Sequence, residues 1–338
     1  MKVMQPWLWV TLAGLLAHSW IQPAIASTDK IDPAEQQAFI DKMVSEHNFT
    51  ASEVERLLSQ ANRNQDILEA IQRPWEAKPW YQYHPIFLTE KRIAGGVKFW
   101  AEHKETLARA EQELGVPAHL IVAIIGVETF YGTYKGKYEV LDALYTLGFH
   151  YPPRQKFFRQ ELAEFMLLMR EEKLEPDNLM GSYAGAMGFG QFISSSYRYY
   201  AIDFDNDGQR DLFNNPVDAI GSVANYFRKH GWTSGHPVAF PLSGEAPAKE
   251  LISGKLKPAQ TVGELTGAGL KLPEQVQAQV ADEMNANVLE LEIEDGHEYW
   301  LTLPNFYVIT RYNHSPLYAM AVYQLSEQIK QDYADSQQ

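Results

Sequence analysis

Cysteine is absent from this chain of 338 residues. Its absence excludes disulfide bonds, thiolate metal sites and attachment of a lipid to a cysteine. A chain of this length can form one large domain or two to three small ones, each around a hydrophobic core of its own. Because no cysteine is available for a lipid or a disulfide, we expect a soluble protein that is compatible with an oxidising, exported compartment.

Basic residues are scarce: the chain has 29 Lys and Arg compared with 43 Asp and Glu, which gives a net charge of −14. This balance argues against nucleic acid and against anionic membrane as partners, because both require a basic face. Aromatic residues are plentiful, with 8 Trp and 18 Tyr. Such side chains stack on sugar rings, although a large core also uses many of them.

Several familiar catalytic devices are missing. The sequence contains no Gly-x-Ser-x-Gly elbow, no His-Glu-x-x-His zinc motif and no phosphate-binding Gly-x-x-x-x-Gly-Lys. His150, His230 and His236 are isolated from other potential catalytic or metal-binding groups in the sequence. We therefore interpret these three histidines as structural or surface residues.

The N-terminus resembles an export signal. Lys2 precedes a mostly apolar run over 7–21, and Ala24-Ile25-Ala26 has the small-x-small form of a cleavage site. A membrane anchor is the alternative, but the run is short and His18 interrupts it. The sequence predicts a signal peptide over residues 1–26, cleaved after Ala26, and a soluble periplasmic protein with no membrane anchor.

The rest of the chain is mainly helical in its patterns. Residues 32–114 show helical spacing and capping signals, and we expect one long helix from Thr89 to Leu114. Strict alternation over 288–294 and again over 297–303 flanks Asp295-Gly296, which predicts a β-hairpin turning at that pair. The fold class predicted is mainly α (α+β), with a small β-rich region.

The most informative stretch is 120–132, which is apolar on all sides apart from Glu128. A helix of this kind lies inside a protein, with Pro117 as its first residue and Gly132 just beyond its end. Glu128 then sits in the last turn, where apolar neighbours and the negative end of the helix dipole both disfavour its charged form. We expect a raised pKa and a general acid, the alternative being a core glutamate with a structural partner.

A second acidic feature is the segment 203–211, which resembles the start of an EF-hand loop. Oxygen ligands occupy positions 1, 3 and 5, Gly208 supplies the turn, and a backbone carbonyl stands at position 7. Asn214 replaces the bidentate Glu expected at position 12, and Asp218 can supply that carboxylate from a longer loop. The predicted ligands are Asp203, Asp205, Asp207, Gln209 and Asp218. We expect weak structural calcium binding, with Kd on the order of 10⁻⁴–10⁻³ M; the alternative is a solvated acidic turn.

Several motifs, spread over about residues 32–330, together resemble those of a known protein family. They are Val127-Glu128-Thr129-Phe130-Tyr131-Gly132, the glycine-rich Gly181–Phe192, the acidic loop at Asp203, Asp218–Phe227 and Thr310-Arg311-Tyr312-Asn313. In this order they closely resemble the B-type lytic murein transglycosylases, glycoside hydrolase family 103. The resemblance implies a lysozyme-like catalytic core with a helical domain, a small β-rich domain and an EF-hand-like calcium loop.

The resemblance also implies a division of the chain. The helical domain comprises 27–116 with 150–180, and the catalytic core comprises 117–149 with 181–234 and 304–332. The calcium loop of the core spans 203–218, and the β-rich domain spans 235–303.

Site residues follow from the matching motifs. Glu128 is implied as the sole catalytic acid and base. The substrate-binding residues implied are Ser182, Gln191, Tyr226, Tyr312, Asn313, Tyr83 and Arg154. Pro153 stands where the family often has the first of two adjacent arginines. We therefore expect weaker recognition of a stem-peptide carboxylate.

The activity implied is cleavage of the bond between N-acetylmuramic acid and N-acetylglucosamine in peptidoglycan, with a 1,6-anhydro product and no cofactor for the chemistry. The partners implied are peptidoglycan glycan strands, with proteins of cell-wall synthesis or hydrolysis as further candidates. The sequence leaves two alternatives open, a hydrolytic muramidase and a non-catalytic peptidoglycan-binding protein.

Overall fold

The structure is a computed structural model that describes residues 31–73 and 78–337. The predicted signal peptide, 1–26, lies outside the described residues. The described chain divides into two compact units: the first contains 31–73 and 132–222, and the second contains 78–131 and 223–337. Each is described by itself below.

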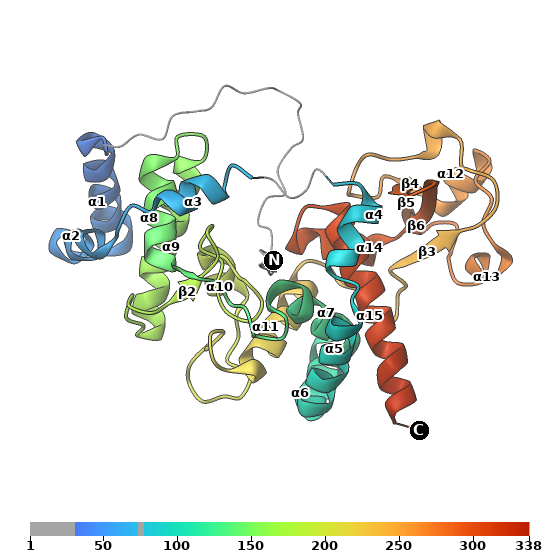
Figure 1. Cartoon of the computed structure of the whole chain (residues 1–338), viewed down its shortest axis with the longest axis horizontal. Coiled ribbons are helices and arrows are strands. Elements are labelled where there is room, and N and C mark those ends of the chain that lie inside the picture. Colours follow the sequence, from blue (N-terminus) through green and yellow to red (C-terminus); the bar gives the residue numbers. More distant parts are fainter. Residues whose placement is uncertain (1–30, 74–77, 338) are drawn as a thin grey trace, which may run out of the picture. The chain divides into compact units, whose positions relative to one another are not determined.

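The first unit is helical (Figure 1). Its elements are α1 (Pro33–His47), α2 (Ala51–Gln60), α3 (Gln65–Ala70), β1 (Tyr138–Glu139), α8 (Val140–His150), α9 (Gln155–Glu172), β2 (Met180–Gly181), α10 (Ser194–Tyr200) and the start of α11 (Pro216–Lys229). Helices α8 and α9 pack against each other, and an ion pair of 2.8 Å between Arg159 and Glu35 joins α9 to α1. Thr50 and Glu53 form the complete capping box expected at α2.

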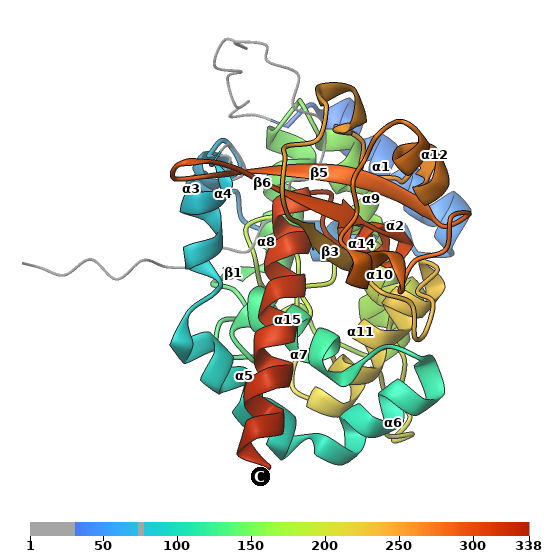
Figure 2. The ribbon, with the colours of Figure 1, turned by 90° about the vertical axis from the view of Figure 1, so that its right-hand side faces the viewer.

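The second unit combines helices with a sheet. It contains the remainder of α11. Its other elements are α4 (Trp80–Tyr83), η1 (His84–Ile86), α5 (Glu90–Glu102), α6 (Lys104–Leu114), α7 (Ala118–Thr129), β3 (Ala239–Leu242), η2 (Lys249–Leu251), β4 (Gln260–Thr261), α12 (Val262–Gly267), α13 (Glu274–Gln277), β5 (Asn285–Ile293), β6 (Gly296–Thr302), α14 (Pro304–Tyr312) and α15 (Pro316–Ser336). Helices α5, α7 and α15 pack side by side (Figure 2). The mainly helical fold class is confirmed.

The apolar run forms α7 as expected. Every residue from Leu120 to Thr129 is buried, so this helix has no solvent face. Pro117 is the N-cap rather than the first helical residue, and the helix ends at Thr129 because Phe130 takes a left-handed conformation (φ 51°). The sequence predicted an end just before Gly132, so the helix ends about half a turn earlier than predicted.

The four-stranded sheet has the order β3-β6-β5-β4, with antiparallel pairs (Figure 1). Ile293 pairs with Gly296, so the two turn residues are Glu294 and Asp295, one position earlier than predicted. Gly296 supplies the positive φ (118°) that follows this turn. One face of the sheet covers a separate hydrophobic cluster that includes Val288, Leu301 and Leu265.

The single long helix expected from Thr89 to Leu114 is two helices. His103 takes a non-helical conformation (φ −116°, ψ 24°), at which α5 ends and α6 begins. The His103 ring lies 4.5 Å from the Phe99 ring, and this packing accompanies the break. Periodicity alone did not show this break, since both helices continue the same apolar spacing.

In the described part of the chain, no single helix has the length and apolar character needed to cross a bilayer. The pair α6 and α7 satisfies the criterion only when the two are taken together, and they are bent by 114° at their junction.

Candidate active site

Glu128 lies in the last turn of α7, and only 6% of its surface is exposed. The neighbouring helices α5 and α15 cover α7, and these elements supply the apolar surroundings. A carboxyl group in such surroundings avoids charge unless something stabilises the anion. The burial of α7 by these helices therefore makes Glu128 an unusual acid.

The hydrogen-bond partner of this acid is Tyr318. Its hydroxyl donates to Glu128 Oε1 at 2.5 Å, and the Tyr318 side chain is fully buried. Ser315 caps α15, accepting the Tyr318 amide, so that Tyr318 occupies the first turn of this helix. Sequence reasoning missed Tyr318. The Ser315-Pro316 cap fixed its place in the helix, but nothing in the sequence joined it to a residue 190 positions away.

Burial sets the protonation of the pair. Desolvation raises the pKa of Glu128 from 4.5 to about 8, and the hydrogen bond from Tyr318 lowers it in part. The same burial, together with the Glu128 charge, holds the pKa of Tyr318 and of Tyr312 well above the ordinary value. At neutral pH Glu128 is therefore mostly protonated and can donate a proton.

A second tyrosine near this acid is Tyr312, whose pKa is raised by burial and by the Glu128 charge. Tyr312, at the end of α14, lies 4.8 Å from the Tyr226 ring and 5.8 Å from the Phe227 ring. The Tyr226 hydroxyl donates to the Arg311 carbonyl at 2.5 Å, which ties α11 to α14. Asn313 follows Tyr312 in an extended conformation and is buried.

Tyr83 belongs to the same unit and is also buried, packed 5.2 Å from the Phe87 ring and 6.4 Å from the Trp80 ring. Its hydroxyl is one of the groups that raise the pKa of Tyr318. Tyr83, Tyr226, Tyr312 and Tyr318 all belong to the second unit, as does Glu128.

The remaining predicted contacts lie in the first unit, where local bonds hold them. The Ser182 hydroxyl accepts the amides of Ala184 and Ala186 at 3.2 and 3.1 Å. Gln191 has a left-handed backbone (φ 50°), and its amide donates to the carbonyls of Lys135 and Gly188.

Arg154 also lies in the first unit. It stands at the N-terminus of α9 with its guanidinium 4.6 Å from the Phe157 ring. Burial lowers the pKa of the Arg154 guanidinium, and the hydroxyls of Tyr151 and Tyr183 partly oppose that shift.

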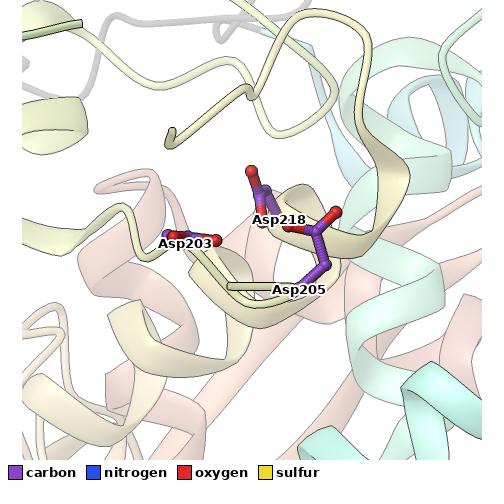
Figure 3. A group of neighbouring side chains, drawn as sticks. All are labelled: Asp203, Asp205 and Asp218. Carbon is purple, nitrogen blue, oxygen red and sulfur yellow. The ribbon is translucent and has the colours of Figure 1, made fainter. Parts of the chain in front are cut away.

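The acidic loop brings three predicted metal ligands together. Oxygens of Asp203, Asp205 and Asp218 lie within 4.8 Å of one another, and the three carboxyl groups point toward one another (Figure 3). Asp207 is not in this cluster; its carboxylate accepts the Gln209 amide at 2.9 Å. The ligand set predicted on the EF-hand pattern is thus brought together only in part.

Asp218 anchors the cluster. It is fully buried in the first turn of α11 and accepts the amides of Phe204 and Asp211 at 2.7 and 2.8 Å. Burial raises the pKa of its carboxyl, and the nearby Asp205 charge adds to the effect. Three carboxylates that share a small space repel one another, and a hard cation would offset this repulsion. The oxygen-only donor set therefore fits calcium.

The fold and this site define a mainly helical protein in which a buried glutamic acid with a raised pKa, Glu128, accepts a hydrogen bond from a buried tyrosine. A family model described as the transglycosylase SLT domain matches residues 32–327, and the chain belongs to this family. The membrane-bound lytic murein transglycosylase B of Escherichia coli (strain K12) is 46% identical over 303 residues, which cover 87% of this chain and 82% of that protein.

Solved structures show the same lysozyme-like fold. The soluble lytic transglycosylase SltB1 of Pseudomonas aeruginosa is 47% identical with a TM-score of 0.81, over 89% of this chain and all of that one. The Escherichia coli lytic transglycosylase Slt35, solved in complex with calcium, is 44% identical with a TM-score of 0.80, over 89% and 94%. SltB3 of Pseudomonas aeruginosa, solved with NAG-anhNAM-pentapeptide, is 29% identical with a TM-score of 0.75, over 87% and 78%.

Proposed function

We propose that this protein is a lytic murein transglycosylase that cleaves the N-acetylmuramic acid–β-1,4–N-acetylglucosamine bond of peptidoglycan and forms a 1,6-anhydro product. The observation that carries the proposal is the Glu128–Tyr318 pair, a protonated carboxylic acid held by a phenol in a buried site. Membership of the family and the names of the relatives support the reaction class.

In the proposed first step, Glu128 donates its proton to the glycosidic oxygen, and the bond from muramic C1 to that oxygen breaks. The Glu128 carboxylate that results accepts a charge-assisted hydrogen bond from Tyr318, which is stronger than the bond to the neutral acid. The pair is thus arranged to favour proton release once the leaving group is in place.

In the second step, the Glu128 carboxylate takes the proton of the muramic C6 hydroxyl while that oxygen closes on C1. The acid is restored, and the proton it first gave remains on the departing sugar. Glycosidases normally need two carboxyl groups. One is enough here because the nucleophile belongs to the substrate and has a high effective concentration. Desolvation and the hydrogen bond from Tyr318 set the pKa of Glu128. No second carboxylate among the described residues contributes to that pKa.

The remaining site residues extend the proposal. The resemblance of the motifs supports Ser182, Gln191, Arg154, Tyr83, Tyr226, Tyr312 and Asn313 as the residues that bind the N-acetyl group and the sugar rings. In addition, we propose the division into a helical domain, a catalytic core and a β-rich domain over the ranges given above.

We further propose that Asp203, Asp205 and Asp218 hold a structural calcium ion. The relative solved with calcium and the clustered oxygen donors support this assignment. The ion would hold the acidic loop to the start of α11 and takes no part in the chemistry. Export to the periplasm and proteins of cell-wall synthesis or hydrolysis as partners complete the proposal.

Mass spectrometry of products from purified sacculi tests the reaction. We expect anhydro-muropeptides, each one water lighter than the hydrolysed product. Hydrolysed products would instead identify a muramidase. This alternative is included because one relative at 43% identity is described as a muramidase/transglycosylase. Binding to sacculi without release of soluble fragments would identify a non-catalytic protein.

A further inference from the structure

Arg92, in α5, is a buried cation whose role the proposed reaction leaves open. Only 2% of its surface is exposed. Its Nε donates to the Gly126 carbonyl at 3.1 Å, and Nη1 donates to the carbonyls of Ile86 and Phe87 at 2.6 and 3.1 Å. Burial lowers the pKa of the guanidinium to about 10, so it stays charged at neutral pH. A buried charge is costly unless its donors are satisfied, and here backbone carbonyls satisfy them.

One of those carbonyls belongs to the last turn of α7, two residues before Glu128. Gly126 O also accepts the Phe130 amide at 3.1 Å, so it receives a bond from the end of its own helix and one from α5. The Arg92 guanidinium lies 5.3 Å from the Phe130 ring as well. Arg92 therefore contacts the chain both before Glu128, at Gly126 in α7, and after it, at Phe130 just beyond the helix.

Tyr131, two residues beyond the end of α7, also contacts Arg92. Its hydroxyl donates to the Arg92 carbonyl at 2.7 Å. Its ring fills a slot lined by three glycines, since a Cβ at Gly95, Gly96 or Gly126 would lie within 2.8 Å of that ring or its hydroxyl. Glycine inside a helix costs about 1 kcal/mol relative to alanine, so α5 and α7 give up stability to admit this ring.

The backbone between these anchors is strained. Phe130 and Tyr131 both have left-handed φ values, 51° and 59°, which each cost a non-glycine residue on the order of 1 kcal/mol or more. The conformation persists only where surrounding contacts fix it, and the contacts of Arg92 and the Tyr131 ring do so. Both strained residues come within three positions of Glu128.

We propose that Arg92 and Tyr131 are positioning residues that fix the last turn of α7, so that the Glu128 carboxyl meets the Tyr318 hydroxyl. Neither touches the substrate in this proposal, and both act through the backbone of α7. The catalytic consequence rests on the proposed function of Glu128, whereas the structural consequence for the Glu128 carboxyl does not.

The decisive variant is Tyr131→Phe, which removes the hydrogen bond to Arg92 but keeps the ring in its slot. Its matched control is Tyr323→Phe, because Tyr323 in α15 also donates to a backbone carbonyl, that of Ala239 at 3.0 Å. We expect Tyr131→Phe to lower kcat about 10-fold with KM within about 2-fold, since a small misplacement of a catalytic group is costly. Tyr323→Phe should leave both near wild type, at a similar melting temperature.

A second measurement does not depend on turnover. Titration of the Glu128 carboxyl by carbon-13 NMR should give a lower pKa in Tyr131→Phe than in Tyr323→Phe, because a loosened turn admits water and relieves the desolvation. The alkaline limb of the kcat profile should move to lower pH with it. Arg92→Lys, which keeps the charge but loses the planar fork, should show the same shift to a larger extent if it folds.

Equal kcat and equal Glu128 pKa in Tyr131→Phe and Tyr323→Phe would overturn the inference. Absence of turnover in the wild type would instead overturn the proposed function, and the NMR titration would still decide whether Arg92 and Tyr131 position the carboxyl.

Discussion

Glu128 and the cluster of Asp203, Asp205 and Asp218 differ in burial and in hydrogen bonding: Glu128 is buried, whereas in the cluster only Asp218 is buried. Glu128 is alone among apolar residues, accepts a single hydrogen bond from Tyr318, and is therefore protonated at neutral pH. Asp203, Asp205 and Asp218 lie together, and backbone amides bond to each of them. The apolar surroundings of Glu128 disfavour its anion, so the carboxyl group keeps its proton at neutral pH. In the cluster, backbone amides offset part of the cost of the anions, the pKa of Asp218 is still raised by burial, and the shared charge is left to be offset by a cation.

The comparison shows that a carboxylate's role depends on what surrounds it. A single acid without amide donors suits proton transfer, whereas a cluster bonded by amides suits a hard metal ion. The predictions below test each side, beginning with the largest effect.

Glu128→Gln should lower kcat by about 10³-fold, because it removes the only proposed proton donor. Folding and binding to sacculi should be retained, since the amide has nearly the same shape. Glu161→Gln is the matched control: Glu161 is also a buried glutamate with a pKa raised by burial, but its carboxylate bonds to Ser195. Release of soluble muropeptides measures both variants, and a similar loss in the two would remove Glu128 from its assigned role.

Tyr318→Phe should lower kcat about 10- to 100-fold, the worth of a hydrogen bond to a charged group. The Tyr318 hydroxyl lowers the pKa of Glu128, so its removal should raise that pKa and move the alkaline limb of the kcat profile to higher pH. This shift is opposite in direction to the one expected for Tyr131→Phe. An unchanged alkaline limb would show that the hydroxyl does not act on the Glu128 carboxyl.

Calcium at 10 mM should raise the melting temperature by about 5 °C over EGTA, since a ligand that binds only the folded state stabilises it. Asp205→Asn should abolish most of this shift, whereas Asp295→Asn, in the exposed hairpin turn, should leave it intact. No shift in the wild type at this concentration would contradict the proposed calcium site.

The smallest effect concerns stability rather than activity. Between pH 4.5 and about 8 the folded protein keeps the Glu128 proton that the unfolded chain has lost. Stability therefore falls as pH rises through this window. Glu128→Gln cannot ionise, so its melting temperature relative to wild type should rise from pH 5 to pH 8 and then level off. A constant difference across this range would indicate that Glu128 titrates normally.

Much of the fold was predictable because local patterns controlled it. Leu120–Thr129 could only be an interior helix, and the alternation around Asp295 could only be a hairpin. The errors arose where packing decided the outcome. His103 divides a continuous helical pattern, and the register of β5 and β6 places the turn one residue early, at Glu294 and Asp295.

For the proposed site, the sequence by itself determined the character of the acid. Glu128 is the only charged residue of a helix that is otherwise almost entirely apolar, so the sequence predicts its desolvation and its raised pKa. Only the tertiary structure decided what meets that acid. Tyr318 lies 190 residues further along the chain, and Arg92 precedes Gly126 by 34 residues. Such contacts depend on how whole helices pack, and no spacing within one helix encodes them.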